Sequence, residues 1–266
     1  MNPVIGHILQ RRGKSVPADD GRKIVLVLWG GIMRGVRGGG AVMALAELGL
    51  SDAFDEIYTV SAGFPTACYL LAGQTPLGMS MFSEELCSKK FLNRWRFWQG
   101  MDVGYLLWAM REKKAMDVDH ILAHPTRLYV RAVNLQKKTF EYLEVHHIGK
   151  DNFWPLMHAA VSVPVLHRYA ARIGEFDYID TNINGHLAEH IRHVLSTDAT
   201  DVLVIYNAPA QRWVDISGDP RVLEICPPKN WKLSRFELRP EALYQAGRDM
   251  GRLVKNVFGE DAGINL

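Results

Sequence analysis

The sequence has 266 residues, of which 48% are hydrophobic and 23% are charged, and its formal net charge is +2. This length and apolar content suffice for one sizeable core, so we expect a single domain over residues 23–266 after a polar N-terminal arm over residues 1–22. The balanced charge gives no electrostatic argument for a nucleic-acid partner, and we expect none. Three cysteines without a CxxC spacing argue against a disulfide framework or a cysteine zinc site, which favours a reducing, cytoplasmic location.

The N-terminal half of the chain alternates predicted strands with predicted helices. The run KIVLVLW is continuous, apolar and rich in β-branched residues, which is typical of a strand buried on both faces. The predicted strands are residues 23–29 and 54–60, and the predicted helices are residues 41–50 and 63–73. Pro65 falls in the first turn of the second helix, where its missing N–H costs little. This order predicts parallel strands joined by right-handed crossovers.

The rest of the chain continues the mixture of helices and strands. Residues 80–125 read as helical with breaks at glycines. Further strands are predicted over residues 127–135, 139–145, 175–180 and 201–207, and further helices over residues 152–166, 185–195 and 240–258. We therefore expect an α/β fold, namely a three-layer α/β/α domain with a mainly parallel central sheet. No apolar run approaches the ~18–20 residues that span a bilayer.

Two short loops follow the first two predicted strands, at the sheet edge where such folds bind ligands. Residues 30–35 read GGIMRG, and adjacent glycines leave backbone N–H groups unobstructed, as an oxyanion hole requires. Residues 60–63 read VSAG, a strand-to-helix turn that would place the oxygen of Ser61 at a helix N-terminus. Neither GxGxxG nor GxxxxGK[ST] is present. Each loop alone is weak evidence, and together they favour a nucleophile at Ser61.

These residues resemble the motifs of the patatin-like phospholipases, especially their compact bacterial members. That family has G-G-G-x-R-G after its first strand, then G-x-S-x-G, and an aspartate in a small-residue turn about a hundred residues or more later. In this chain GGIMRG supplies Gly30, Gly31, Arg34 and Gly35, TVSAGF supplies Ser61 and Gly63, and FDYIDTNINGH supplies Asp180. The resemblance extends from about residue 23 to residue 251.

The resemblance implies a patatin-like fold and a serine acyl hydrolase that acts on phospholipid, lysophospholipid or another carboxylic ester, with no metal or cofactor. It implies a Ser–Asp dyad in which Ser61 is the nucleophile and Asp180 is the base. It assigns the oxyanion hole to Gly30, Gly31 and Ile32 with support from Arg34, and the support of the elbow to Ala62 and Gly63. Since an aspartate of ordinary pKa, about 3.9, is a weak base at neutral pH, we expect burial to raise its basicity.

Three positions depart from the family pattern. Ile32 replaces the third glycine, Thr59 replaces the first glycine of the elbow, and Thr181 and Asn182 replace the small residues after the aspartate. The N–H of Ile32 is retained as a donor if the local turn keeps a negative φ, and we expect backbone strain of about 1–3 kcal/mol at Thr59. These departures keep open a second hypothesis, a catalytically impaired relative that binds lipid or a partner without turnover.

The histidines offer two alternatives. HLAEH matches the H-x-x-E-H pattern, in which His186 and His190 would bind zinc and Glu189 would be the base. A triad of Ser61, Asp180 and His190 has the chain order of α/β-hydrolases. A zinc site would need a further ligand downstream, so we expect no metal. The triad would need the chain to fit the α/β-hydrolase fold more closely, so we prefer the dyad.

Residues 89–100 interleave basic and aromatic side chains. This pattern is typical of a membrane interface, and equally of a helix whose aromatic residues pack onto the core. We favour core packing, with part of the segment lining an acyl pocket, and we keep peripheral membrane contact as an expectation.

Overall fold

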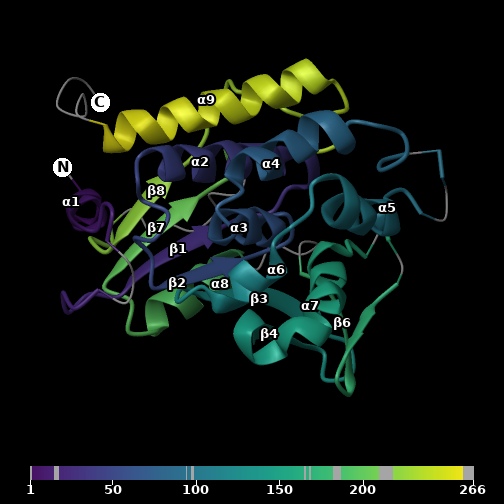
Figure 1. Ribbon diagram of the computed structural model, residues 1–266, viewed down its shortest axis with the longest axis horizontal. Coiled ribbons are helices and arrows are strands. Elements are labelled where there is room, and N and C mark those ends of the chain that lie inside the picture. The colour runs from purple at the N-terminus through teal and green to yellow at the C-terminus, as the bar shows by residue number, and fades with distance from the viewer. Residues whose placement is uncertain are drawn as a thin grey trace.

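The computed structural model describes residues 2–14, 18–93, 95–96, 99–164, 166–167, 169–181, 187–209 and 218–259. Within these residues one sheet has the strand order β5-β6-β3-β2-β1-β7-β8, with β4 paired to β3 outside this path (Figure 1). The strands are β1 (Ile24–Leu28), β2 (Glu56–Thr59), β3 (Arg127–Asn134), β4 (Thr139–Glu144), β5 (Ala171–Ile173), β6 (Phe176–Asp180), β7 (Asp201–Ile205) and β8 (Val222–Ile225).

The centre of this sheet is parallel. β1 lies between β2 and β7, and β3 and β8 extend the parallel part on either side. β4 and β6 pair with β3 in antiparallel orientation, as does β5 with β6. β1, β2 and β7 are buried along their whole length, as expected for strands that carry continuous apolar runs and are covered on both faces.

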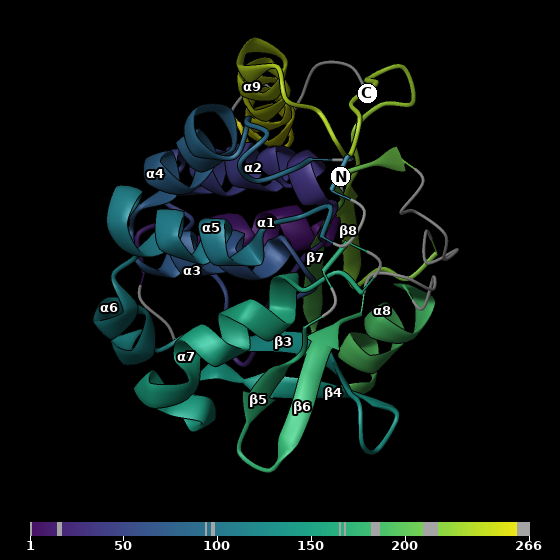
Figure 2. The ribbon, with the colours of Figure 1, turned by 90° about the vertical axis from the view of Figure 1, so that its right-hand side faces the viewer.

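Helices cover both faces of the sheet, and Figure 2 shows α8 on one face and the other helices on the opposite face. The helices are α1 (Pro3–Gln10), α2 (Val36–Glu47), α3 (Gly63–Leu71), α4 (Thr75–Ser80), α5 (Val103–Trp108), α6 (Val118–Ala123), α7 (Val145–Val161), α8 (Leu187–Ser196) and α9 (Pro240–Phe258). A 3-10 turn, η1 (Ile32–Gly35), and two π-helical turns, η2 (Met81–Glu85) and η3 (Ala109–Lys113), complete the set. No described helix combines the length and apolarity needed to cross a membrane.

Each face of the sheet has its own hydrophobic core. Leu26 and Leu28 of β1 join the larger core beneath α2, α3, α7 and α9. Val25 and Val27 join the smaller core beneath α8. Because successive strand residues point to opposite faces, this alternation is what a three-layer arrangement requires. The predicted α/β/α architecture with a mainly parallel sheet is therefore confirmed.

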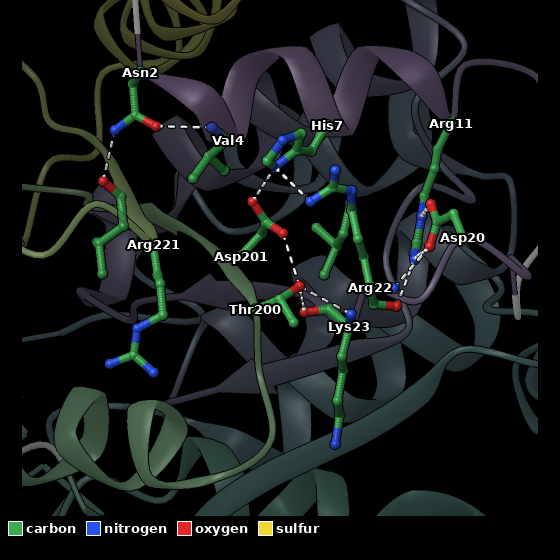
Figure 3. A network of polar contacts seen from close by, with 12 residues as sticks. Asn2, Val4, His7, Arg11, Asp20, Arg22, Lys23, Thr200, Asp201 and Arg221 are labelled. Atoms are coloured by element: carbon green, nitrogen blue, oxygen red, sulfur yellow. Dashed lines mark hydrogen bonds and ion pairs between the residues drawn. The ribbon is translucent and has the colours of Figure 1, made fainter.

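The N-terminal segment packs against this domain. Within residues 1–22, which the sequence analysis treats as a polar arm, α1 buries Val4 in the larger core. The Nδ1 atom of His7 lies 2.6 Å from a carboxylate oxygen of Asp201 in β7, and the side chain of Asn2 donates to a main-chain carbonyl of β8 (Figure 3). These contacts hold α1 at the edge of the sheet, and the division into arm and domain stays a prediction.

α2 begins at Val36 rather than residue 41, earlier than the sequence pattern indicates. α7 spans Val145–Val161, but Gly149 within it has a non-helical φ of +73°, so the residues before Gly149 form a separate turn ahead of the predicted helix. The early turns of α2 contain three consecutive glycines, which disfavour an isolated helix. Tertiary packing explains them. A Cβ on Gly40 would lie 2.9 Å from the Cα of Gly247 in α9, and closer still to its carbonyl group. The missing side chains let α2 and α9 pack backbone to backbone.

Candidate active site

Ser61 lies in the turn between β2 and α3. Its φ is +54°, in the left-handed region that residues with a side chain seldom adopt. The turn is closed by the N–H of Gly63, which donates to the carbonyl of Val60, and by that of Phe64, which donates to the carbonyl of Ser61, both at 2.9 Å. Such a conformation costs about 1–3 kcal/mol and is concentrated at functional sites. The local geometry is that of a sharp strand-to-helix elbow.

The residues after Ser61 fit the same description. Ala62 has helical backbone angles and caps α3. A Cβ on Gly63 would lie 2.9 Å from the carbonyl carbon of Leu28, so the first turn of α3 packs directly on the main chain of β1. This close approach fixes the position of the elbow relative to the end of β1. Residues 30–35, which we call the glycine loop, begin there.

The glycine loop passes beside the side chain of Ser61. A Cβ on Gly30 would lie 3.0 Å from the Oγ of Ser61, 2.9 Å from the carbonyl oxygen of Val60, and closer to the Cβ of Ser61. Only glycine fits at this contact. The next two N–H groups, of Gly31 and Ile32, donate to no acceptor among the described residues. Two unengaged donors therefore follow the residue that touches the serine, as an oxyanion hole requires.

Ile32 has a φ of +55°, so the condition of a negative φ at this residue is not met. Gly31 has a φ of +150°, and the two residues together turn the chain into η1. The loop is held from outside, because the N–H of Met33 donates to the carbonyl of Arg235 at 3.3 Å and the Nε of Arg34 donates to the carbonyl of Leu233 at 2.7 Å. These bonds, with the packing of the Ile32 side chain on the larger core, offset the cost of the left-handed backbone.

Thr59 does not carry the strain that its position predicts. It is the last residue of β2, is fully buried, and is not among the residues with positive φ. Its hydroxyl donates to the carbonyl of Tyr129 in β3 at 2.8 Å. A β-branched residue suits a strand end, so the strain of this loop pair lies at Ser61 and Ile32 instead.

Asp180 is the last residue of β6 and is 1% exposed. It pairs with Ala132 of β3, while Thr59 pairs with Val130 on the other side of β3. Ser61 follows two residues beyond Thr59, past the end of β2, so β3 lies between the strands that precede the two candidate residues.

β3 lies between β2 and β6, so the ends of these two strands, Thr59 and Asp180, are about two strand spacings apart, or roughly 10 Å between their backbones. The strand between them carries only the small side chain of Ala132, which is itself buried. Alternate strand residues share a face, so Asp180 lies on the same face as Tyr178, in the larger core. Ser61 borders the cavity on that face. Thr181 follows half-buried, and Asn182 lies outside the described residues.

An apolar cavity opens beside Ser61. It encloses about 540 Å³ of empty space, including the part open to solvent. Its wall includes Ala62, Met81, Phe82, Phe91, Leu106 and Met110. The hydroxyl of Tyr69, another wall residue, is already engaged with the carbonyl of Lys114 at 2.6 Å. The cavity is therefore suited to a hydrocarbon chain.

In the segment 89–100 one aromatic residue packs in the core and another is exposed, as a membrane interface would require. Phe91 is 3% exposed and lines the cavity, as core packing predicts. Trp95 is 74% exposed, so core packing is wrong for this residue. The guanidinium of Arg96 donates to two main-chain carbonyls of the same segment. Arg94, Phe97 and Trp98 lie outside the described residues.

His190 lies on the opposite face of the sheet from the cavity. It is fully buried in the aromatic cluster beneath α8, with its Nδ1 2.9 Å from the hydroxyl of Tyr142 and its ring 5.0 Å from that of Trp29. Burial holds the pKa of this imidazole well below its usual value. This placement argues against a triad with Ser61.

The zinc alternative has no support in the described part of the chain. Glu189 pairs with Arg131 at 3.1 Å, and His186 lies outside the described residues. The described residues contain no group of three or more side chains that could hold a metal ion.

Asn207 is a site residue that sequence reasoning missed. It follows β7, is 1% exposed, and its side-chain amide donates to the carbonyls of Trp29 and Gly30, the latter at 3.2 Å. Asn207 therefore holds the main chain at Gly30, the residue that contacts Ser61. A polar residue directly after a buried strand was the available signal.

The chain is similar to one protein family and to solved structures. The model of the patatin-like phospholipase family matches residues 26–181, a span that contains both loops and Asp180. Among solved structures, VipD from Legionella pneumophila is similar over 88% of this chain and 67% of its own, at 13% identity and a TM-score of 0.48. No curated protein matches. The family generally hydrolyses lipid esters. Since the matched span is more than half of its length, this chain belongs to the patatin-like phospholipase family.

Proposed function

We propose that the protein is a serine acyl hydrolase for lipid or other carboxylic esters, with Ser61 as nucleophile and Asp180 as base. The observation that carries the proposal is the environment of Ser61. This residue lies in a left-handed elbow, against Gly30, next to two unengaged N–H groups and at the wall of an apolar cavity. No single one of these features requires a hydrolase, but each supplies a separate part of its chemistry.

The first half-reaction would acylate the serine. The acyl chain enters the cavity, and the Oγ of Ser61 attacks the ester carbonyl while Asp180 accepts its proton. The negative charge that develops on the carbonyl oxygen is stabilised by the N–H groups of Gly31 and Ile32. Collapse of the tetrahedral intermediate breaks the ester bond, and the leaving alcohol takes the proton from Asp180.

The second half-reaction would release the acid. Water attacks the acyl-enzyme and gives a proton to Asp180, and the same N–H groups stabilise the second oxyanion. The proton returns to Ser61 as the carboxylic acid leaves. In this scheme Arg34 and Asn207 keep the glycine loop in place, and no metal or cofactor takes part.

Peripheral contact with a lipid surface belongs to the same proposal. Trp95 is largely exposed, and it lies four residues after Phe91, which lines the cavity. An exposed aromatic side chain on this segment suits contact with a lipid surface. The three cysteines, all within the described residues, form no disulfide, which is compatible with a cytoplasmic location.

Covalent labelling with a fluorophosphonate probe tests the proposal against the impaired-relative hypothesis. We expect labelling of the wild type, none in Ser61→Ala, and unchanged labelling in Ser80→Ala, a matched serine on α4. Asp180→Asn should fold and lose ester hydrolysis. A folded wild type that binds lipid vesicles without labelling would favour the binding protein, and activity abolished by a chelator would revive a metal mechanism.

A further inference from the structure

A second concavity lies on the far side of the glycine loop. It holds about 1200 Å³ of empty space, including the part open to solvent, and shares no wall residue with the cavity at Ser61. One wall is formed by the start of α2 and the glycine loop, through Arg34 and Arg37, and the other by residues 229–239. We call this concavity the basic groove, because its charged side chains are Arg34, Arg37, Lys229, Lys232, Arg239 and a single carboxylate, Glu237.

The positive charge of the basic groove is largely uncompensated. Among the described wall residues the only carboxylate is that of Glu237, which is bound by Arg239 at 2.9 Å, and this ion pair lowers the pKa of Glu237 to about 2. The other four cations form no ion pair within the described residues. Lys229 and Lys232 are exposed and can adjust to a ligand.

Arg37 is the second, independent observation. Its side chain is 2% exposed, and its two terminal nitrogens donate to the main-chain carbonyls of Asn207 at 2.9 Å and Trp231 at 2.7 Å. Its Nε is buried and has no hydrogen-bond partner. Burial and the neighbouring Arg34 both lower its pKa.

A buried guanidinium that has only carbonyl partners is a costly arrangement, and no carboxylate in the described part of the chain is paired with Arg37. The acidic residue that acts on Arg37 from α9 is Asp249, which is itself engaged by Gln245 and by Arg252 at 3.2 Å. An anion in the groove would supply the missing compensation for Arg37 and for Arg34 together.

We propose that the basic groove binds a phosphate group, carried either by a free phosphate compound or by the headgroup of an anionic lipid. Arginine and lysine side chains gathered around one space match the several charged oxygens of a phosphate. The proposal does not depend on hydrolysis at Ser61, because the groove and the cavity have separate walls.

A phosphate in the basic groove would act on the glycine loop. Arg34 and Met33 bond to the carbonyls of Leu233 and Arg235, so the loop and the opposite wall of the groove are already connected. A ligand that bridges Arg34 and Lys232 would strengthen that connection. Because it binds the folded state alone, it also raises the melting temperature.

The test compares the wild type with Lys229→Glu/Lys232→Glu, and uses Lys137→Glu/Lys138→Glu on an exposed turn as the matched control. Melting temperature and calorimetric binding are measured with inorganic phosphate, against chloride at equal ionic strength. Vesicles of phosphatidylcholine with and without phosphatidic acid are tested in a Ser61→Ala background, where no hydrolysis can occur.

We expect phosphate to raise the melting temperature of the wild type and the control, and the groove variant to bind at least about tenfold more weakly, the loss expected for one charge-assisted contact. Groove-dependent binding of phosphatidic acid vesicles, with no response to inorganic phosphate, would assign the phosphate to a lipid headgroup. The proposal is overturned if neither ligand binds, or if both bind the groove variant as well as the control. Loss of labelling at Ser61 would leave these outcomes unaffected.

Discussion

Replacement of Gly30 by alanine should separate the glycine loop from Ser61. The added Cβ would lie less than 3 Å from the Cβ of Ser61 and 2.9 Å from the carbonyl oxygen of Val60. Carbon atoms in contact prefer about 3.5–4.0 Å, so the loop or the elbow must move by roughly 1 Å or more. A displacement of about 1 Å at a reacting group costs up to ~10²-fold in rate. We therefore expect Gly30→Ala to lose one to two orders of magnitude in kcat.

The assay is hydrolysis of a short-chain p-nitrophenyl ester, combined with the rate of fluorophosphonate labelling and a melting curve for each variant. The matched control is Gly6→Ala on α1, where an added Cβ meets nothing within 4 Å. This control should keep its activity and gain up to ~1 kcal/mol of stability from helix propensity. A folded Gly30→Ala protein with wild-type kcat and labelling rate would refute the reasoning.

Three further predictions concern stability and selectivity. Thr59→Val removes the hydrogen bond to Tyr129 and should cost about 1 kcal/mol, or a melting temperature lower by ~2–4 °C; an unchanged melting temperature would show that the bond contributes nothing. The pKa of His158 is lowered to about 4 by burial and by His167. The unfolded chain takes up this proton below pH ~6.5 and the native protein only near pH 4, so stability should fall as the pH drops between these values, and His158→Gln should flatten that part of the melting-temperature profile. Leu106→Trp fills part of the cavity and should reduce hydrolysis of a dodecanoyl ester far more than of an acetyl ester, whereas equal losses would contradict an acyl site there.

The parts of the fold that the sequence predicted are those with a local cause. β1 and β7 are continuous apolar runs, and α9 has a long amphipathic pattern, so periodicity identifies them without knowledge of their neighbours. β5 and β8 were not predicted, because strands of three and four residues are too short to show an alternation of apolar and polar residues. The early start of α2 was not predicted, because its glycines disfavour a helix unless their contact with α9 is known.

The candidate site shows the same division. The order of the two loops along the chain indicated the place of Ser61, because parallel strands bring their carboxyl ends to one edge. The left-handed backbone of Ile32 depends on bonds to residues 233–235, and the support of Gly30 comes from Asn207, both about 200 residues away in sequence. Such long-range contacts leave no periodic signal, so the sequence could not show them.

The backbone contact between Gly40 and Gly247 has a consequence for how the protein comes into being. During synthesis the glycine loop and the elbow emerge early, while β7, β8 and α9 are still to be made. Until then β1 has one unpaired edge, and the glycine face of α2 is uncovered. Contacts so distant in sequence form slowly. A ribosome-bound chain would thus carry an incomplete candidate site, and the proposed hydrolysis would begin only after α9 has docked.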